Sequence, residues 1–212
     1  MIKVSVVIPV WNQESLIERA VHSIPRRDDV EIVAVDDAST DDTLQKLFTL
    51  REERNDPNFV ILSLPENRGV GYAVNVGLNA VSGEYTVLLG SDDYFMTEEF
   101  EKMMELLDGT DLVYFDLQVN NGDIWHLNKT SKKVFVGAVK FMRTAFVGDT
   151  RCPEIRNGED WFFTQDLMAK DPTETFSGRT VLHYNWPRKG SLTYMANVAK
   201  ERANGKNGTN RR

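Results

Sequence analysis

A regular alternation of short apolar runs and amphipathic helical patterns within residues 1–108 restricts the fold more than any other feature of this chain. The apolar runs lie at residues 3–10, 30–37, 59–64 and 85–90, and the helical patterns at 12–24, 39–54, 69–81 and 97–108. These runs are rich in β-branched residues and do not alternate with polar ones, so we expect strands buried on both faces. Ser39 or Thr40 is expected to cap the second helix and Thr97 the fourth. The alternation predicts an α/β fold with a doubly wound, mostly parallel sheet.

The second half of the chain has a less regular pattern. We expect strands at residues 111–119 and 180–187, a helix at 158–170, and strands or a strand with a short helix at 134–142. Residues 200–212 are polar and basic, so this tail is expected to be flexible. The C-terminal half is therefore expected to belong to the same domain, with a less regular order of elements than the N-terminal half.

The net charge, the cysteine content and the lengths of the apolar runs limit which classes of protein this chain can belong to. The net charge of −7 over 212 residues argues against a surface that binds polyanions throughout, although it leaves room for a local basic patch. The single cysteine, Cys152, leaves no partner for an intramolecular disulfide, so a cytoplasmic location is expected. No apolar run approaches the ~18 residues of a membrane span, and the N-terminus is strand-like rather than a signal peptide. Any membrane association is therefore expected to be peripheral.

Polar residues follow three of the predicted strands at the point where each strand ends. They lie at residues 9–12, 36–37 and 91–93. In open α/β sheets ligands bind outside the carboxyl ends of the strands, and parallel strands bring those ends to one edge. Independent surface turns would not require this arrangement. It therefore predicts a ligand site at that edge.

Asp92 and Asp93 place two adjacent carboxylates after a buried strand. Such hard oxygen ligands suit a divalent cation completed by phosphate oxygens and water, and the alternative is a solvated acidic loop. Asp36 and Asp37 could accept from a nucleotide base or from ribose hydroxyls. Gly71 would allow a ligand to approach the backbone closely near a helix N-terminus.

A second acidic pair, Glu159 and Asp160, opens the predicted helix at 158–170. These carboxylates either complement the helix dipole or supply a general base aimed at the site. Trp161, directly after them, is either a core residue or an aromatic wall on which an acceptor sugar stacks. His183 is either structural or a metal ligand, and His126 is isolated in the sequence.

The chain resembles the family 2 glycosyltransferases of the GT-A fold. The resemblance rests on the order and spacing of "VSVVIPVWN" with Glu14, "VAVDDASTDDT", "ENRGVGYAVNVGLNAVSGEYTVLLGSDDYF", "GEDW" and "YNWPRKGSLT", which span most of residues 3–193. It implies an inverting hexosyl- or pentosyltransferase that uses a nucleotide-diphosphate sugar, with a UDP-sugar favoured, and Mn²⁺ or Mg²⁺. Trp11 stands where tyrosine is usual, and "PRKGSLT" lacks the histidine that many relatives carry.

The resemblance also implies roles for individual residues. It implies nucleotide-sugar binding by Pro9, Trp11, Glu14, Asp36, Asp37, Asn67, Arg68, Gly71, Asn75, Ser91, Asp92, Arg188 and Ser191. Asp93, with Asp92, would bind the metal, and Asp160, supported by Glu159, would be the catalytic base. Trp161 is expected to bind the acceptor. Residues 1–108 would then bind the nucleotide sugar, residues 109–199 would carry the acceptor site and base, and residues 200–212 would form the tail.

Two other function classes are weighed against this one. A nucleotidyltransferase acting on sugar phosphates would share the sheet and the metal chemistry, but its glycine- and lysine-rich loop is not matched by "WNQES" after the first strand. A sugar-nucleotide-binding protein without catalysis would not need both Asp93 and Asp160. The sequence does not identify the acceptor, although a glycan is expected before a protein or a hydroxylated nucleobase. It does not indicate the oligomeric state.

Overall fold

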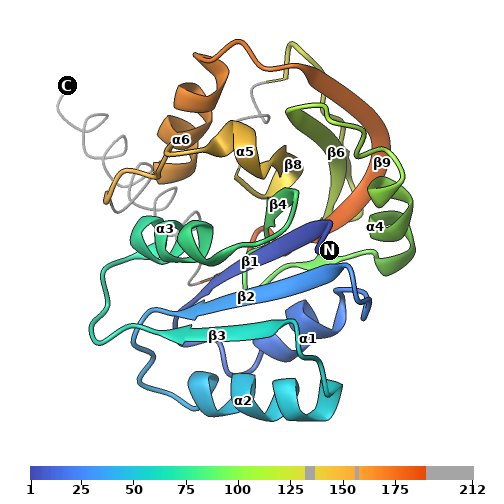
Figure 1. The fold of residues 1–212 in the computed structure, drawn as a ribbon. Coiled ribbons are helices and arrows are strands. Elements are labelled where there is room, and N and C mark those ends of the chain that lie inside the picture. Colours follow the sequence, from blue (N-terminus) through green and yellow to red (C-terminus); the bar gives the residue numbers. More distant parts are fainter. Residues whose placement is uncertain (132–136, 156–157, 190–212) are drawn as a thin grey trace, which may run out of the picture.

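The structure is a computed structural model, and it describes residues 1–131, 137–155 and 158–189 (Figure 1). The N-terminal half contains strands β1 (Val4–Val10), β2 (Val30–Asp36), β3 (Phe59–Ser63) and β4 (Tyr85–Leu88). Its helices are α1 (Ile17–His22), α2 (Thr43–Arg54), α3 (Val70–Ala80) and α4 (Thr97–Met104). All four predicted strands and all four predicted helices are present.

The four N-terminal strands form a parallel sheet in the order β3-β2-β1-β4. Helix α3 packs on β1 and β2 from one face, while α2 packs on β2 and β3 from the opposite face with α1 beside it (Figure 1). Every residue of β2 is buried, because both faces of this strand are covered. The predicted doubly wound arrangement is confirmed.

The C-terminal half extends the same sheet. Its strands are β5 (Tyr94–Phe95), β6 (Leu112–Val119), β7 (Ile124–Trp125), β8 (Lys140–Arg143) and β9 (Glu174–Tyr184), and its helices are α5 (Thr144–Val147) and α6 (Glu159–Met168). A 3₁₀ turn, η2 (Gly137–Val139), leads into β8. The order of the described strands is β3-β2-β1-β4-β8-β6-β9-β5, with β7 on β6. Because β8 is antiparallel to both β4 and β6, strands β6 and β9 run in the same direction as β1 to β4.

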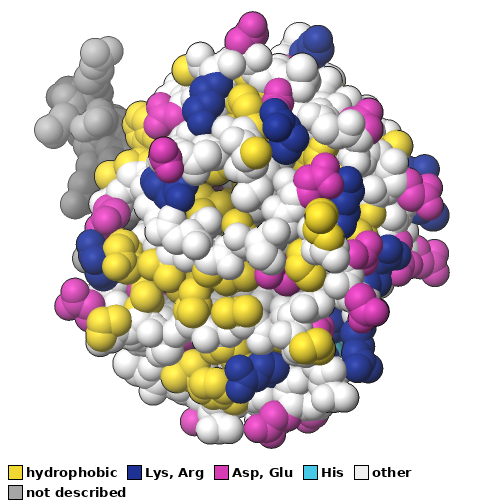
Figure 2. Space-filling model, in the orientation of Figure 1, with side chains coloured by type: hydrophobic (Ala, Val, Ile, Leu, Met, Phe, Trp, Pro, Cys, Tyr) yellow, Lys and Arg dark blue, Asp and Glu magenta, His cyan; other side chains and the backbone are white. Residues whose placement is uncertain are grey.

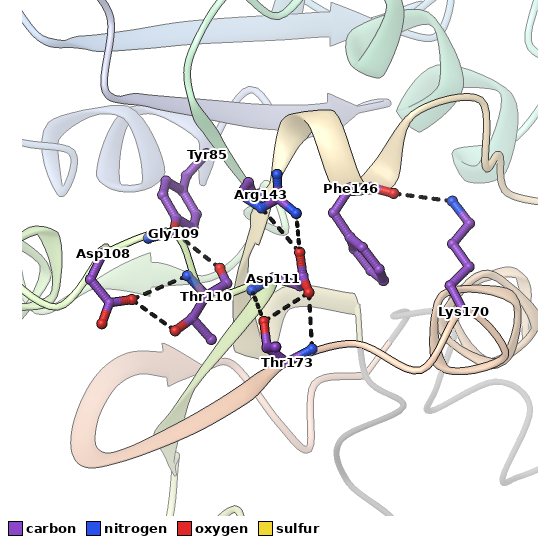
Figure 3. Close-up of polar contacts among 9 residues, drawn as sticks. All are labelled: Tyr85, Asp108, Gly109, Thr110, Asp111, Arg143, Phe146, Lys170 and Thr173. Atoms are coloured by element: carbon purple, nitrogen blue, oxygen red, sulfur yellow. Dashed lines mark hydrogen bonds and ion pairs between the residues drawn. The ribbon is translucent and has the colours of Figure 1, made fainter.

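A buried carboxylate joins three of these C-terminal segments (Figure 3). Asp111, just before β6, accepts a hydrogen bond from Arg143 Nε at 3.0 Å. Its other oxygen accepts from the amide and the hydroxyl of Thr173, just before β9, at 2.9 and 2.7 Å. Burial opposes ionisation, but the bonds from Thr173 and Arg143 outweigh it and lower the pKa of Asp111. This carboxylate therefore holds the starts of β6 and β9 against the end of β8.

The helix caps predicted from sequence are wrong. Helix α2 begins at Thr43, because Ser39 and Thr40 are used elsewhere: the amide of Asn12 donates to Ser39 Oγ, and the amide of Thr40 donates to Asn12 Oδ1. Thr97 is the first helical residue of α4 rather than its cap, and its hydroxyl donates to a backbone carbonyl after α1. In each case a contact distant in sequence competes with the local cap.

Further element boundaries also differ from expectation, and helix α1 begins at Ile17 rather than at residue 12. Strand β9 begins at Glu174 rather than at residue 180, because it pairs with β6 from Leu112 onward. Helix α4 ends at Met104, four residues short of the predicted end. Part of the predicted segment 134–142 and all of residues 200–212 lie outside the described residues. Within the residues that the structure describes, no helix is long and apolar enough to cross a membrane.

The surface on the side shown in Figure 2 carries acidic and basic side chains interspersed, without a large area of one sign. Hydrophobic side chains gather on this face between α3 and β3. Strand β3 is the edge of the sheet, and its Val60 is exposed. This side of the molecule therefore shows no extended basic face of the kind that binds a polyanion, in agreement with the net charge.

Candidate functional site

The carboxyl ends of β1, β2 and β4 are neighbours, because β1 lies between the other two and all three are parallel. The loops that leave β1 and β2 are joined to each other. Asn12 bonds with Ser39 and Thr40, and the amide of Asp42 donates to Glu14 Oε2 at 3.1 Å. The polar residues after these strands thus form one continuous edge, as the sequence predicts.

Asp36 ends β2 with a buried and only partly satisfied carboxylate. The residue is 1% exposed, and its Oδ2 accepts from the amide of Ser39 at 3.3 Å. Among the described residues nothing hydrogen-bonds to Asp36 Oδ1. A buried carboxylate oxygen without a donor is costly, so this atom is suited to accept from a ligand. Pro9 is partly buried in β1, and the Trp11 side chain that follows is half exposed.

Asp37 holds the loop before α3. The amides of Arg68 and Gly69 each donate to one of its carboxylate oxygens at 2.8 Å, and Asn67 Nδ2 donates to its carbonyl at 3.1 Å. Gly69 has a φ of +91°, which favours glycine at the start of this helix. The Arg68 guanidinium pairs with Glu154 at 2.7 Å. These contacts position the loop at the site edge, and binding of the nucleotide by these residues stays a prediction.

Gly71 and Asn75 connect α3 to the segment that precedes α6. A Cβ on Gly71 would lie 2.7 Å from the carbonyl oxygen of Pro153, so only glycine fits without a shift. Asn75 and Cys152 exchange two hydrogen bonds of 2.8 Å, one in each direction between side chain and backbone. Both residues thereby help to place the C-terminal half of the chain against the N-terminal half.

Asp93 is the more buried of the two predicted metal ligands, and it is 3% exposed. The amide of Asn185 donates to its Oδ1 at 2.8 Å, and a Cβ on Gly90 would lie 2.6 Å from its Oδ2. Burial, and then the charge of Asp92, raise the pKa of Asp93 well above its ordinary value. Ser91 is also buried. The site therefore contains a carboxylate whose ionised form requires added positive charge.

Two arginines contact Asp92. Arg188 Nε donates to its Oδ2 at 2.7 Å, and Arg19 Nη2 donates to its carbonyl at 2.8 Å. The Arg19 guanidinium lies 4.6 Å from the ring centroid of Tyr94, and His183 stacks on the same ring at 4.5 Å. Burial and then the Arg19 charge lower the pKa of His183, so the imidazole is neutral at pH 7. The sequence analysis missed Arg19, because an arginine on the polar face of a helix looks like any solvated one.

The donor set fits a divalent cation that is shared with a ligand. Within the described part of the chain no group of three or more His, Cys, Asp or Glu side chains could hold a metal. Asp92 and Asp93 supply two carboxylates, and a hard cation takes six to eight (Ca²⁺) or six (Mg²⁺) oxygens. The missing ligands would therefore have to be phosphate oxygens and water. Ser191, also predicted at this site, lies outside the described residues.

Asp160 lies in the first turn of α6, next to the end of β4. Its Oδ2 accepts from the amide of Gly137 at 3.3 Å, and its Oδ1 accepts from the amide of Trp161 at 2.8 Å. A Cβ on Gly137 would lie 3.3 Å from Asp160 Cβ and 3.4 Å from Leu88 Cδ1, so all three residues meet. Since Leu88 ends the strand that leads to the paired aspartates, the structure brings the predicted base and the predicted metal ligands to the same strand end.

The neighbours of Asp160 bear on its predicted role. Burial, followed by the charge of Asp160, raises the pKa of Glu159. Trp161 is 39% exposed, so its ring is available at the surface beside the predicted base. Phe163, in contrast, is fully buried. The helix therefore buries one aromatic residue in the core and presents another next to Asp160.

Sequence reasoning missed two further charged features near the acceptor half. Lys140 in β8 is fully buried, and its Nζ donates to Thr164 Oγ1 at 3.1 Å. Asp116 in β6, 2% exposed, accepts from His126 Nδ1 at 2.6 Å and from the amide of Leu127 at 2.8 Å. Both features join residues distant in sequence, and no local pattern marks them.

Comparison with known proteins agrees with these observations. The family model for glycosyl transferase family 2 matches residues 5–175. The poly(ribitol-phosphate) β-N-acetylglucosaminyltransferase TarS of Staphylococcus aureus is 27% identical over 95% of this chain, which corresponds to 38% of TarS. The poly(ribitol-phosphate) β-glucosyltransferase of Bacillus spizizenii is 27% identical over 94% of this chain and 34% of its own length. The chain therefore spans about two fifths or less of the length of these relatives.

Solved structures give the same fold. A crystal structure of TarS residues 1–349 with UDP-GlcNAc matches with a TM-score of 0.78 and 25% identity, over 91% of this chain and 61% of that one. The mannosyltransferase PcManGT of Pyrobaculum calidifontis, in complex with GDP-Man and Mn²⁺, matches with a TM-score of 0.73 and 20% identity, over 93% and 61%. The predicted GT-A fold is confirmed, and the family model covers most of the sheet and both acidic pairs. The chain belongs to glycosyl transferase family 2.

Proposed function

We propose that this chain is the donor-binding and catalytic unit of an inverting glycosyltransferase that moves a sugar from a UDP-sugar to an acceptor hydroxyl. The observation that carries the proposal is the meeting of two acidic sites at the end of β4. Asp93 follows that strand with a buried carboxylate, and Asp160 reaches the same strand end through Gly137 and Leu88. One site is suited to the leaving diphosphate and the other to the attacking hydroxyl.

Asp92 and Asp93 would hold a Mn²⁺ or Mg²⁺ ion, which supplies positive charge beside the diphosphate of the donor. The raised pKa of Asp93 supports this role, because its carboxylate gains most from a nearby cation. Arg188 already contacts Asp92 and adds a second positive charge on the same side. These residues favour departure of the diphosphate by compensating the charge that develops on it.

Asp160 would accept the proton of the acceptor hydroxyl as that oxygen attacks the anomeric carbon from the face opposite the diphosphate. The amide of Gly137 donates to Asp160 Oδ2, and this hydrogen bond orients the carboxylate. Glu159, whose pKa is raised, lies next to it in α6. General bases positioned in this way contribute typically about 10²–10⁴-fold to a rate.

The donor proposal rests on Asp36 and on the relatives. Asp36 Oδ1 is buried without a donor among the described residues, so it could accept from an N–H of a nucleotide base. Trp11, half exposed directly after β1, could stack on that base. TarS has been crystallised with UDP and with UDP-GlcNAc, which favours uridine over other bases for a chain of this similarity.

For the acceptor we propose a polyol or glycan hydroxyl. The two long relatives act on poly(ribitol-phosphate), and Trp161 offers an exposed ring next to the proposed base. A nucleotidyltransferase is no longer favoured, because the matched family transfers sugars. The cytoplasmic location expected from composition stays a prediction.

Calorimetric titration with UDP, GDP, CDP and TDP, with and without Mn²⁺, tests the donor site. We expect Mn²⁺-dependent binding of UDP, and its loss in Asp93→Asn, which removes the charge but keeps the shape. Glu98→Gln, an exposed acid in α4, is the matched control and should bind as the wild type does. If no nucleotide binds in the presence of metal, the proposed function is wrong.

A further inference from the structure

Lys140 is buried to a degree that is rare for lysine. The residue is 0% exposed in the middle of the sheet, in strand β8. Lysine is almost never fully buried unless it is paired, because removing its charge from water is costly. Burial lowers the pKa of Lys140 to about 8, so the ammonium form still predominates at pH 7. The fold therefore maintains an internal positive charge at a cost in stability.

The position of this charge is set by two contacts between the η2–β8 segment and α6. The amide of Gly137 donates to Asp160 Oδ2 at 3.3 Å, and Lys140 Nζ donates to Thr164 Oγ1 at 3.1 Å. Gly137 and Lys140 are three residues apart, and Asp160 and Thr164 are one helical turn apart. Residues four apart on a helix share a face, with Cβ atoms about 5–6 Å from each other. The ammonium group thus lies on the sheet side of the turn that carries Asp160.

Among the described residues, the groups that face Lys140 include Tyr114, Cys152 and Asp160. The ring of Tyr114 in β6 lies with its centroid 5.9 Å from Nζ, and burial raises the pKa of its phenol. Burial, and then the charges of Glu159 and Asp160, raise the pKa of the Cys152 thiol to about 12. The negative charge of Asp160 is what most opposes the loss of the Lys140 proton. The two groups therefore interact as a cation and an anion.

We propose that Lys140 is a positioning residue for sugar transfer: its buried positive charge keeps the Asp160 carboxylate ionised and oriented when donor and acceptor fill the cleft. The inference rests on the proposed role of Asp160 as the base. Glu159 and Asp160 are adjacent carboxylates, and the donor adds a diphosphate nearby. Once substrates exclude water, these like charges would favour protonation of Asp160, and a fixed cation behind it opposes that.

Lys140→Met tests the charge, because methionine keeps most of the unbranched side chain and removes the ammonium group. We expect UDP affinity with Mn²⁺ to stay within about twofold of the wild type, since Lys140 is on the acceptor side. We expect the acid limb of the kcat–pH profile to be displaced upward by about one pH unit, so that kcat falls up to about tenfold on that limb. The activity of the variant should approach that of the wild type as the pH rises above the displaced limb. Lys102→Met, which removes an exposed lysine from α4, is the matched control and should leave the limb in place.

Two outcomes would overturn the inference. One is an acid limb in Lys140→Met that coincides with the wild type, and the other is a loss of kcat that is equal at every pH, which indicates a purely structural role. If Lys140→Met does not fold, the charge pair can be tested by melting. Asp160→Asn should then lower the melting temperature at pH 7 in the wild type but less in Lys140→Gln, and equal effects in both backgrounds would contradict the pair. If Asp160→Asn transfers sugar at the wild-type rate, the proposed base itself is wrong.

Discussion

At the scale of single residues, the site is made of buried charges that the protein satisfies only in part. Asp36 keeps one carboxylate oxygen without a donor among the described residues, Asp93 is buried beside Asp92, and Lys140 is buried beneath α6. Each arrangement costs stability when no ligand is bound. Such costs are typical of functional sites, and for Asp36 and Asp93 a substrate or a metal would supply the compensating partner. For Asp93 and Lys140, these costs should be measurable in how stability depends on pH.

Asp93→Asn should change how stability depends on pH in the absence of metal. The folded pKa of Asp93 is raised above its ordinary 3.8, so the folded state holds this proton more tightly than the unfolded state. The contribution of Asp93 to the free energy of unfolding is therefore fully present below about pH 3.8. It is lost as the pH rises through the folded pKa. The free energy of unfolding of the wild type should fall relative to Asp93→Asn over that window. Urea titrations at several pH values measure it, and a wild type that gains relative to the variant would contradict the assignment.

Lys140→Met should show the opposite trend at alkaline pH. Burial lowers the folded pKa of Lys140 to about 8 from 10.5, so between these values the unfolded state binds more protons. The wild type should therefore gain stability relative to the variant as the pH rises from 8 to 10.5. Melting temperatures of both proteins across that range check it, with Lys102→Met as the control. A difference in melting temperature between the two proteins that does not change with pH would mean that Lys140 is not buried as an ammonium ion.

At the scale of elements, short polar contacts place helix α6 and the strands around it. Asn75 and Gly71 hold the segment before α6 on α3, and Asp111 joins β6, β8 and β9 (Figure 3). Lys170, just after α6, donates to two backbone carbonyls of α5, including that of Phe146. Because α6 carries the proposed base, these contacts determine where that base lies relative to β4.

Asp111→Asn should lower the free energy of unfolding by about 1.5–3 kcal/mol, because it removes a charge-assisted pair with Arg143 and turns one acceptor oxygen into a donor facing Thr173. Asp108→Asn is a suitable control, since Asp108 is exposed and only bonds within its own turn to Thr110. Its loss of stability should be clearly smaller than that of Asp111→Asn. Urea denaturation at pH 7 compares the two. Equal losses would show that Asp111 does no more than a local turn residue.

At the scale of the whole molecule, the N-terminal and C-terminal halves of the chain share one sheet. Strand β8 comes from the second half of the sequence, yet it pairs with β4 of the first half and with β6. A boundary at residue 108 therefore separates predicted roles rather than separate folding units. The site lies where the two halves join, so its geometry depends on both.

We therefore expect a single cooperative unfolding transition. Trp11 reports on the first half, and Trp125 and Trp186 report on the second. Tryptophan fluorescence and far-UV circular dichroism should give coincident urea curves, and variants that leave only Trp11 or only Trp186 should give the same midpoint. Two separated midpoints would mean that the halves unfold independently.

The pattern of residues along the chain was sufficient to predict the parallel N-terminal sheet, the family, and the sheet edge at which the candidate site lies. These follow from local information, because a strand buried on both faces must be apolar along its length and parallel strands must end at one edge. Asp93 and Asp160 were recognisable because their motifs are continuous in sequence. The roles of these two and of the other predicted site residues were implied by the same motifs, and all of them stay predictions.

The surroundings of these residues, in contrast, are seen only in the folded molecule. The sequence pattern placed Ser39 and Thr40 at a helix cap, but Asn12 binds them instead. It gave no sign that Lys140 is buried next to the helix of Asp160, or that Arg19 contacts Asp92. Each of these contacts joins segments far apart in the chain. Their energies depend on distance and burial in the folded molecule, which no local pattern of residues encodes.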